Sequence, residues 1–166
     1  MIGDTTIKRI DTELQDDLKK ELRDQGHYLT GALERSFTST QSTTGGKSVI
    51  EIKALDYAED LFEGKRPEHI DPNDPAYIKG LTAYAQKRFG KTGKAALKAA
   101  VAIARKHSEE GMPTKNSYQY SNTGERLFAN VEAYNKNEDI YDQMLETGAS
   151  AEIDSFIDKT FDQTIF

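Results

Sequence analysis

The sequence predicts one α+β domain in which a small antiparallel β-hairpin packs against several amphipathic helices. Two observations predict it. The chain has 166 residues, which is enough for one domain with a core and too few for two ordinary ones. The hydrophobic period also changes along the chain. It is helical over residues 5–25, strictly alternating over 48–55, and helical again after 75.

The first helix is expected over residues 5–25, where apolar residues recur at intervals of three and four. They share one helical face and are Ile7, Ile10, Leu14, Leu18 and Leu22. Gly26 is well placed to end the helix, because glycine readily takes the left-handed conformation found there. A second short helical segment over 27–33 adds two apolar side chains to the same core, Leu29 and Leu33.

A hairpin is expected over residues 36–55. Its strands are 36–41 and 48–55, and the loop STTGG at 42–46 supplies the glycines that a hairpin turn needs. In the second strand one face carries Ile50, Ile52 and Ala54. Two strands alone are marginally stable in water, so this ribbon must pack on helices or pair with a strand of a neighbour.

Helices follow the hairpin, separated by a proline-rich loop. We expect them at 57–63, 76–89, 92–110, 138–146 and 150–161. Asp56 and Asp74 are expected to cap two of them. The hairpin should pack on the helices at 5–25 and 92–110, burying Leu14, Leu18, Ile50, Ile52, Leu97, Val101 and Ile103. The last helix should bury Ile153, Phe156, Ile157 and Phe161.

Composition narrows the class of protein. The chain contains no cysteine, which excludes disulfides, thiolate metal sites and a cysteine nucleophile. The N-terminus lacks the apolar run of a signal peptide, and no stretch is apolar enough to span a membrane. We therefore expect a soluble, intracellularly made protein with no membrane partner.

Charge is distributed unevenly along the chain, although the net charge is only −6. Residues 79–106 contain eight cations and no acid: Lys79, Lys87, Arg88, Lys91, Lys94, Lys98, Arg105 and Lys106. Residues 138–162 contain eight acids and one lysine: Glu138, Asp139, Asp142, Glu146, Glu152, Asp154, Asp158 and Asp162, with Lys159. Charge patterning alone leaves open whether the two segments pair within one chain or between copies.

No pattern favours an enzyme or a cofactor. His69 with Asp71 and Asp74 could be drawn as a metal site, but both aspartates have turn or capping roles in a proline-rich loop. His107 lies near a helix C-terminus, where a cation is favoured. The segment 90–94 resembles a phosphate loop only superficially and is better explained as the end of one helix and the start of the next. We expect no metal, no cofactor and no catalytic residue.

The stretch GMPTKNSYQYSNTGERLF, residues 111–128, is unusual. It is too polar for a core strand, too rich in turn formers for a helix, and too aromatic for an idle linker. It lacks the apolar periodicity needed to fold onto the domain by itself. Two interpretations remain open: an arm that contacts a neighbouring protein through Tyr118, Tyr120 and Arg126, or an Ω-like loop packed on its own domain.

Three motifs in order resemble the small neck and tail-completion proteins of tailed bacteriophages. They are LTGALERSF (29–37), SVIEIKALDYAEDLFEGKRP (48–67) and the stretch 111–128 with its Pro-Thr, Tyr and Thr-Gly-x-Arg elements. The likeness covers roughly residues 5–130. Leu29 stands where the family usually has proline, and the acidic tail after residue 137 is not covered.

The resemblance implies a structural virion protein of the neck or tail, assembled in the host cytoplasm. It implies copies of itself in a six- or twelve-fold ring, portal, adaptor and tail proteins as partners, and genomic DNA that passes without sequence-specific contact. Residues 1–137 would form the family-like domain and 138–166 an acidic helical extension. The candidate interface residues are Met112, Tyr118, Tyr120, Arg126, Lys91, Lys94, Lys98 and Arg105.

A DNA-binding or regulatory module is the alternative function. The basic helix at 91–106 offers charges for phosphates. It is rich in alanine and poor in aromatic residues, so it has few groups with which to read bases.

Overall fold

The computed structural model describes the backbone at residues 4–27, 31–45 and 47–162, and within those ranges side chains from Thr5 to Ala151. The elements in chain order are α1 (Asp4–Asp24), α2 (Ala32–Ser36), β1 (Thr38–Thr44), β2 (Lys47–Lys53), α3 (Tyr57–Glu63), η1 (Pro67–His69), α4 (Pro75–Phe89), α5 (Gly93–Glu110), η2 (Lys115–Tyr120), α6 (Ala129–Asn135) and α7 (Glu138–Asp162). This is the α+β class that the sequence predicts: a two-stranded antiparallel sheet with several helices.

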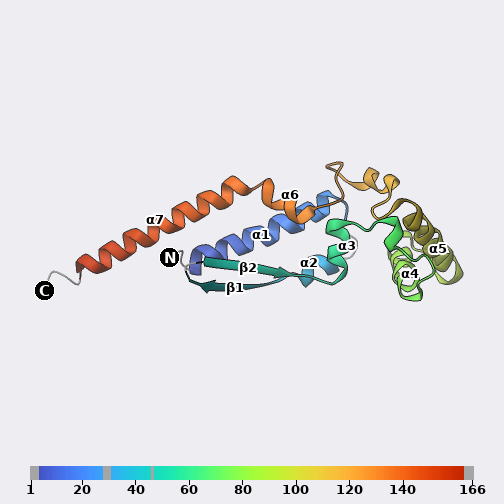
Figure 1. Ribbon diagram of the computed structural model, residues 1–166, viewed down its shortest axis with the longest axis horizontal. Coiled ribbons are helices and arrows are strands. Elements are labelled where there is room, and N and C mark those ends of the chain that lie inside the picture. Colours follow the sequence, from blue (N-terminus) through green and yellow to red (C-terminus); the bar gives the residue numbers. More distant parts are fainter. Residues whose placement is uncertain (1–3, 28–30, 46, 163–166) are drawn as a thin grey trace.

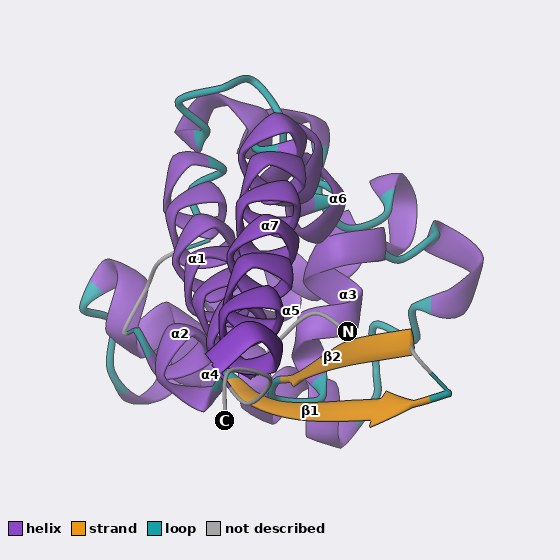
Figure 2. Cartoon of the chain, turned by 90° about the vertical axis from the view of Figure 1, so that its left-hand side faces the viewer, coloured by secondary structure: helices purple, strands orange, loops and turns teal. Residues whose placement is uncertain are grey.

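The molecule is elongated (Figure 1). Helix α1 and the hairpin form its middle, and α4 and α5 form a separate helical hairpin at one end. Helix α7 runs beside α1, as the view along the long axis also shows (Figure 2), and its C-terminal half extends past the N-terminal end of α1. The two ends of the molecule are therefore built from α4–α5 and from α7.

The core lies where the C-terminal half of α1 meets α2, α3, α6 and the base of the hairpin. Its buried members are Leu18, Leu22, Leu33, Phe37, Ala58, Ala129 and Ala133. The helical face predicted for residues 5–25 is confirmed by the burial of four of its five members, while Leu14 is half-buried. Leu29, which was expected beside Leu33, lies outside the described residues.

The hairpin has a shorter loop than expected, and its strands cover 38–44 and 47–53 instead of 36–41 and 48–55. Strand β1 continues to Thr44, paired with Lys47, so residues 42–44 belong to the ladder rather than to the loop. Threonine and serine suit an exposed strand, and here they pair across to β2. The predicted alternation is confirmed, with Ile50 and Ile52 half-buried and Glu51 and Lys53 exposed. The two isoleucines are less buried than predicted because the ribbon is covered on one face only.

The expected packing of the hairpin on α5 is wrong, because α5 lies at the far end of the molecule (Figure 1). Helix α5 instead packs on α4 along a seam of small residues, Ala85, Ala96, Ala100 and Ala104, all fully buried. Leu97, predicted to be buried, is 47% exposed, and Val101 and Ile103 are half-buried. Because α5 packs mainly on α4, only one stripe of its surface is buried, and that stripe consists of small side chains.

The helix caps are partly as predicted. The Asp74 carboxylate accepts the backbone N–H of Ala76 at 2.8 Å and starts α4 with Pro75 in its first turn. Asp56 occupies the corresponding position before α3 but makes no side-chain capping bond. In this chain both aspartates mark the start of a helix, but only Asp74 also makes the capping hydrogen bond.

The C-terminal region differs from expectation in two ways. Helix α6 was not predicted, and α7 is one helix where two pieces at 138–146 and 150–161 were expected. Gly148 stays helical and lets α7 approach α1 closely, since a Cβ there would lie 2.3 Å from the Thr6 Oγ1. The expected burial of Ile153, Phe156, Ile157 and Phe161 concerns side chains that lie outside the described ones.

Candidate assembly surfaces

The stretch 111–128 folds back on its own chain. Met112 pairs with Lys65 through two backbone hydrogen bonds, of 2.7 and 2.8 Å. Gly64, with φ 75°, permits this approach, because a Cβ there would lie 2.6 Å from the Met112 carbonyl oxygen. The chain then forms the short helix η2 and returns along the C-terminus of α1.

The C-terminus of α1 anchors the returning segment with polar groups. Gln25 is fully buried, and its Nε2 donates to the Glu21 carboxylate and to the Leu127 carbonyl, both at 3.1 Å. The backbone N–H of Asn122 donates to the Asp24 carbonyl at 2.7 Å. Gly26 permits the contact, because a Cβ there would meet the Tyr120 carbonyl oxygen at 2.3 Å.

Arg126 and His27 form the second anchor. The Arg126 carbonyl lies 3.0 Å from the His27 Nε2, and because a carbonyl only accepts, that nitrogen carries the proton. The His27 Nδ1 then accepts from the Arg126 guanidinium at 3.5 Å, and the guanidinium also donates to the Ser117 carbonyl at 3.2 Å. The imidazole can make both contacts only when it is neutral.

Burial and charge agree with a neutral imidazole. The pKa of His27 is lowered to about 4, mainly by burial and also by the positive charge of Arg126, while the bond to the Arg126 carbonyl acts in the opposite direction. Burial also lowers the pKa of the Arg126 guanidinium. A protonated His27 would face the Arg126 cation in a half-buried site, which is unfavourable, so Arg126 carries the single positive charge of the pair.

The expectation that residues 112–126 cannot fold onto the domain by themselves is wrong. They are held by polar contacts with the end of α1, so the segment folds onto the domain without apolar periodicity. The Arg126 guanidinium faces inward, and Met112 and Tyr118 are half-buried. Tyr120 is 55% exposed, with the Arg88 guanidinium 5.5 Å from its ring centroid, and offers the largest free surface of the four candidates in this stretch.

A basic surface covers the helical hairpin α4–α5. We call it the basic end; its exposed cations are Lys79, Lys87, Arg88, Lys91, Lys94, Lys98 and Arg105. Lys106 differs from them in pairing with Glu109 and Glu110; among the described side chains no other member of the predicted basic set forms an ion pair. Phe89 and Leu97 are exposed between these cations, so the surface is basic with apolar patches.

An acidic surface covers the first half of α7. We call it the acidic end; its described and exposed members are Glu138, Asp139, Asp142 and Glu146. In Figure 1 the basic end lies at one extreme of the long axis, whereas the first half of α7 lies beside α1, nearer the middle of the molecule and away from α4–α5. Charge patterning left open whether the two segments pair within one chain; the described side chains form no ion pair between them.

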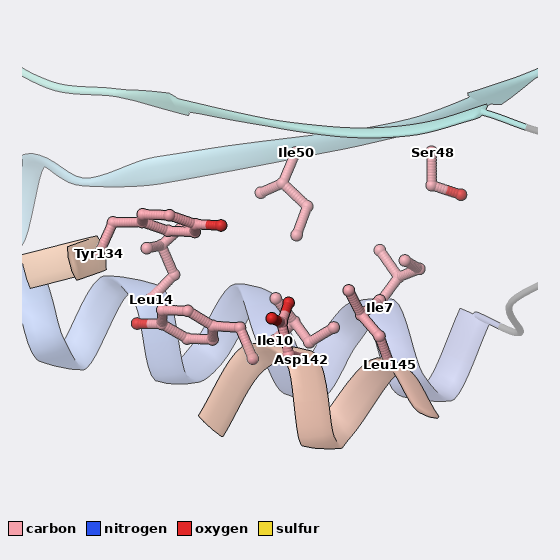
Figure 3. Close-up of a pocket in the computed structure, with 9 residues that line it drawn as sticks. Ile7, Ile10, Leu14, Ser48, Ile50, Tyr134, Asp142 and Leu145 are labelled. Carbon is pink, nitrogen blue, oxygen red and sulfur yellow. The ribbon is translucent and has the colours of Figure 1, made fainter. Parts of the chain in front are cut away.

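An apolar groove of about 240 Å³ lies between α1, β2 and the α6–α7 region (Figure 3). It is lined by Ile7, Ile10, Leu14, Ser48, Ile50, Tyr134, Tyr141, Asp142 and Leu145. Tyr134 and Tyr141 stack with ring centroids 5.6 Å apart. The Tyr141 hydroxyl donates to Asp17 at 2.5 Å, and burial, together with this bond, raises the pKa of Tyr141. The Tyr141–Asp17 hydrogen bond in this region holds α7 against α1.

The histidines and aspartates singled out in the sequence can be placed individually. Within the described ranges no group of three His, Asp or Glu side chains could hold a metal ion. Asp71 accepts the N–H of Asn73, the turn role that the sequence predicts. His107 bonds through Nδ1 to the Tyr77 hydroxyl at 2.6 Å, and burial lowers its pKa, opposite to the expected helix-end cation. Gly90 takes the left-handed conformation between α4 and α5, as predicted.

No family model, curated protein or solved structure matches the chain. Nor is any helix in the described part of the chain long and apolar enough to cross a membrane.

Two anchoring residues were missed from the sequence, Gln25 and His27. A signal for Gln25 exists. It continues the stripe of Leu18 and Leu22 at the next interval of three, so a polar residue falls on the buried face just before the helix ends. Such a placement indicates a buried polar group held by hydrogen bonds; here the Gln25 Nε2 has partners, while its Oε1 has none among the described residues. Nothing in the sequence around His27 indicates its pairing with a residue 99 positions away.

Proposed function

We propose that the protein is a structural virion component that forms part of a ring at the portal–tail junction of a tailed phage, where it lines or seals the DNA conduit. The observation that carries the proposal is the separation of a basic end and an acidic end along one elongated chain. The three motifs that resemble neck and tail-completion proteins supply the class of assembly.

A subunit of a ring needs two different contact surfaces, because it binds one neighbour through the first surface and the other neighbour through the second. The two charged ends meet that need. The hairpin adds a second kind of contact. In the described part of the chain it is a two-stranded sheet with both edges unpaired, and β1 is almost entirely exposed. Unpaired edges are templates for a strand of a partner.

Incorporation into particles tests the proposal. A phage with the gene disrupted should package DNA but fail to form stable tailed particles, and the purified protein should restore them in an extract. A Tyr120→Ala protein should restore them poorly, because its exposed aromatic ring is an expected contact. Normal tailed particles without the protein would contradict the proposal.

Duplex DNA binding is the second candidate function, favoured by Lys91, Lys94, Lys98 and Arg105, which are exposed and form no ion pair with any described side chain. Such binding should weaken steeply with salt, with a logarithmic slope that falls by about 0.9 for each phosphate contact removed. Replacing these cations one at a time with Gln measures that slope. A tight, salt-sensitive duplex complex of the monomer, together with normal particles in its absence, would favour this function over the first.

A further inference from the structure

The two charged ends present matched stripes. Lys94, Lys98 and Arg105 are spaced by four and seven residues, which places them on one face of α5. Asp139, Asp142 and Glu146 are spaced by three and four and share one face of α7. All six are exposed. At about 1.5 Å per residue the stripes are about 16 and 10 Å long, so the shorter fits within the longer.

Among the described side chains, no ion pair joins these two stripes. Helix α7 is held against α1 by the Tyr141–Asp17 hydrogen bond and by the close approach of Gly148 to Thr6. Helix α5 is held against α4 at the other end of the molecule. Both elements are therefore held in place with their charged residues exposed, although Asp142 also borders the groove of Figure 3.

We propose that the acidic face of α7 in one copy docks on the basic face of α5 in the next copy. The inference rests on the proposed ring-forming function and names the two surfaces that would meet. Leu97 lies beside the basic stripe and is 47% exposed, and Ile140 on α7 is 48% exposed. The basic surface thus combines charges with an uncovered apolar side chain, whereas Ile140 lies about 130° around α7 from the acidic stripe, so on the acidic side the contact relies on charge.

The contact is heterologous, because different surfaces of the two copies meet. It therefore repeats from copy to copy and gives a closed ring or an open chain rather than a two-fold dimer. It also depends on salt, because exposed charge pairs are screened as ionic strength rises.

Charge reversal tests the contact. The basic-end variant carries Lys94→Glu, Lys98→Glu and Arg105→Glu; the acidic-end variant carries Asp139→Lys, Asp142→Lys and Glu146→Lys. Sedimentation velocity at low salt should show self-association of the unmodified chain. Each variant alone should self-associate at least about tenfold more weakly, because like charges then face each other. An equimolar mixture of the two variants should recover association, since each supplies the surface complementary to the other.

Circular dichroism of each variant separates lost docking from lost folding. Recovery on mixing is itself a control, because a misfolded variant would not regain a specific partner. Salt should weaken association of the unmodified chain and of the mixture alike.

Three results would overturn the inference: an unmodified chain that stays monomeric, a variant that self-associates as well as the unmodified chain, or a mixture that recovers nothing. If the basic-end variant loses duplex DNA binding while self-association is unchanged, the basic end serves nucleic acid instead. None of these results decides the proposed function, because incorporation of the unmodified chain into particles is measured separately.

Discussion

His27 and Arg126, 99 residues apart in sequence, contact each other at both nitrogens of the imidazole ring. The Nε2 of His27 donates to the Arg126 carbonyl, and its Nδ1 faces the Arg126 guanidinium. The contact joins the end of α1 to the segment that leads into α6. It depends on a neutral ring, because a protonated Nδ1 can no longer accept.

Acid should therefore destabilise the fold through His27. Its pKa is about 4 in the folded chain against an ordinary value of 6.5. Between those values the unfolded chain binds a proton that the folded chain does not, so the free energy of unfolding falls as pH decreases from 6.5 towards 4. The loss has an upper bound of about 3 kcal/mol. Urea unfolding at a series of pH values measures it.

The His27→Gln variant is the control for this pH dependence. Carboxylates and His107 titrate in both proteins, so the difference between the two unfolding curves isolates His27. That difference should shrink as pH falls from 6.5 to 4. Parallel pH profiles for the two proteins would contradict the assignment.

Arg126 should hold the segment 112–126 against the domain in the isolated chain. Replacing it with Ala removes a donor from the Ser117 carbonyl and from His27, at a cost of about 1–3 kcal/mol. Trypsin should then cut after Lys115 much faster than in the unmodified chain. Limited proteolysis with mass spectrometry measures the rate.

Tyr120→Ala is the matched control. The ring is largely exposed and its contact with Arg88 is a surface one, so the change should cost at most about 1 kcal/mol. If instead the unmodified chain were cut after Lys115 as fast as the Arg126→Ala variant, the segment would not be held on its own domain. The first of the two interpretations from the sequence, an arm that contacts a neighbouring protein, would then apply.

The sequence predicts elements whose pattern is local. Periodicity and glycine positions place α1, α3, α4, α5 and the hairpin within a few residues. It does not predict which helix covers which face, because that depends on packing between distant segments. The segment 111–128 shows the same limit. Its anchors join residues about 100 positions apart, such as Gln25 to Leu127; the helical stripe places Gln25 on a buried face, but no local pattern identifies its partner.

Leu18 and Leu97 test this distinction directly. Both lie on apolar helical stripes and both were expected to be buried, but Leu18 is 6% exposed and Leu97 is 47% exposed. Leu18→Ala should lower the free energy of unfolding by about 2–5 kcal/mol, as for a buried core residue. Leu97→Ala should change it by at most about 0.5 kcal/mol, as for a surface site. Equal losses would mean that α5 is covered in the isolated chain.

The last prediction compares substitutions of two helical glycines, Gly148 and Gly80. Both lie inside helices, where alanine normally stabilises by about 1 kcal/mol relative to glycine. At Gly80 in α4 an added Cβ meets no atom within 4 Å, so Gly80→Ala should raise the melting temperature. At Gly148 the Cβ would lie 2.3 Å from the Thr6 Oγ1 and 2.8 Å from its Cβ. Gly148→Ala should therefore destabilise by about 1–3 kcal/mol, the usual cost of overpacking, despite its higher helix propensity.

The source of that loss can be identified with a second change at the same contact. Thr6→Ala removes the hydroxyl and the methyl that lie closest to the new Cβ, so adding it to Gly148→Ala should recover part of the stability. The same substitution in the unmodified chain should not stabilise it, because it only removes contacts there. If Gly148→Ala and Gly80→Ala stabilise equally, α7 does not lie against the N-terminal end of α1. The acidic end would then lose its fixed position, and the proposed contact between copies would lose its structural basis.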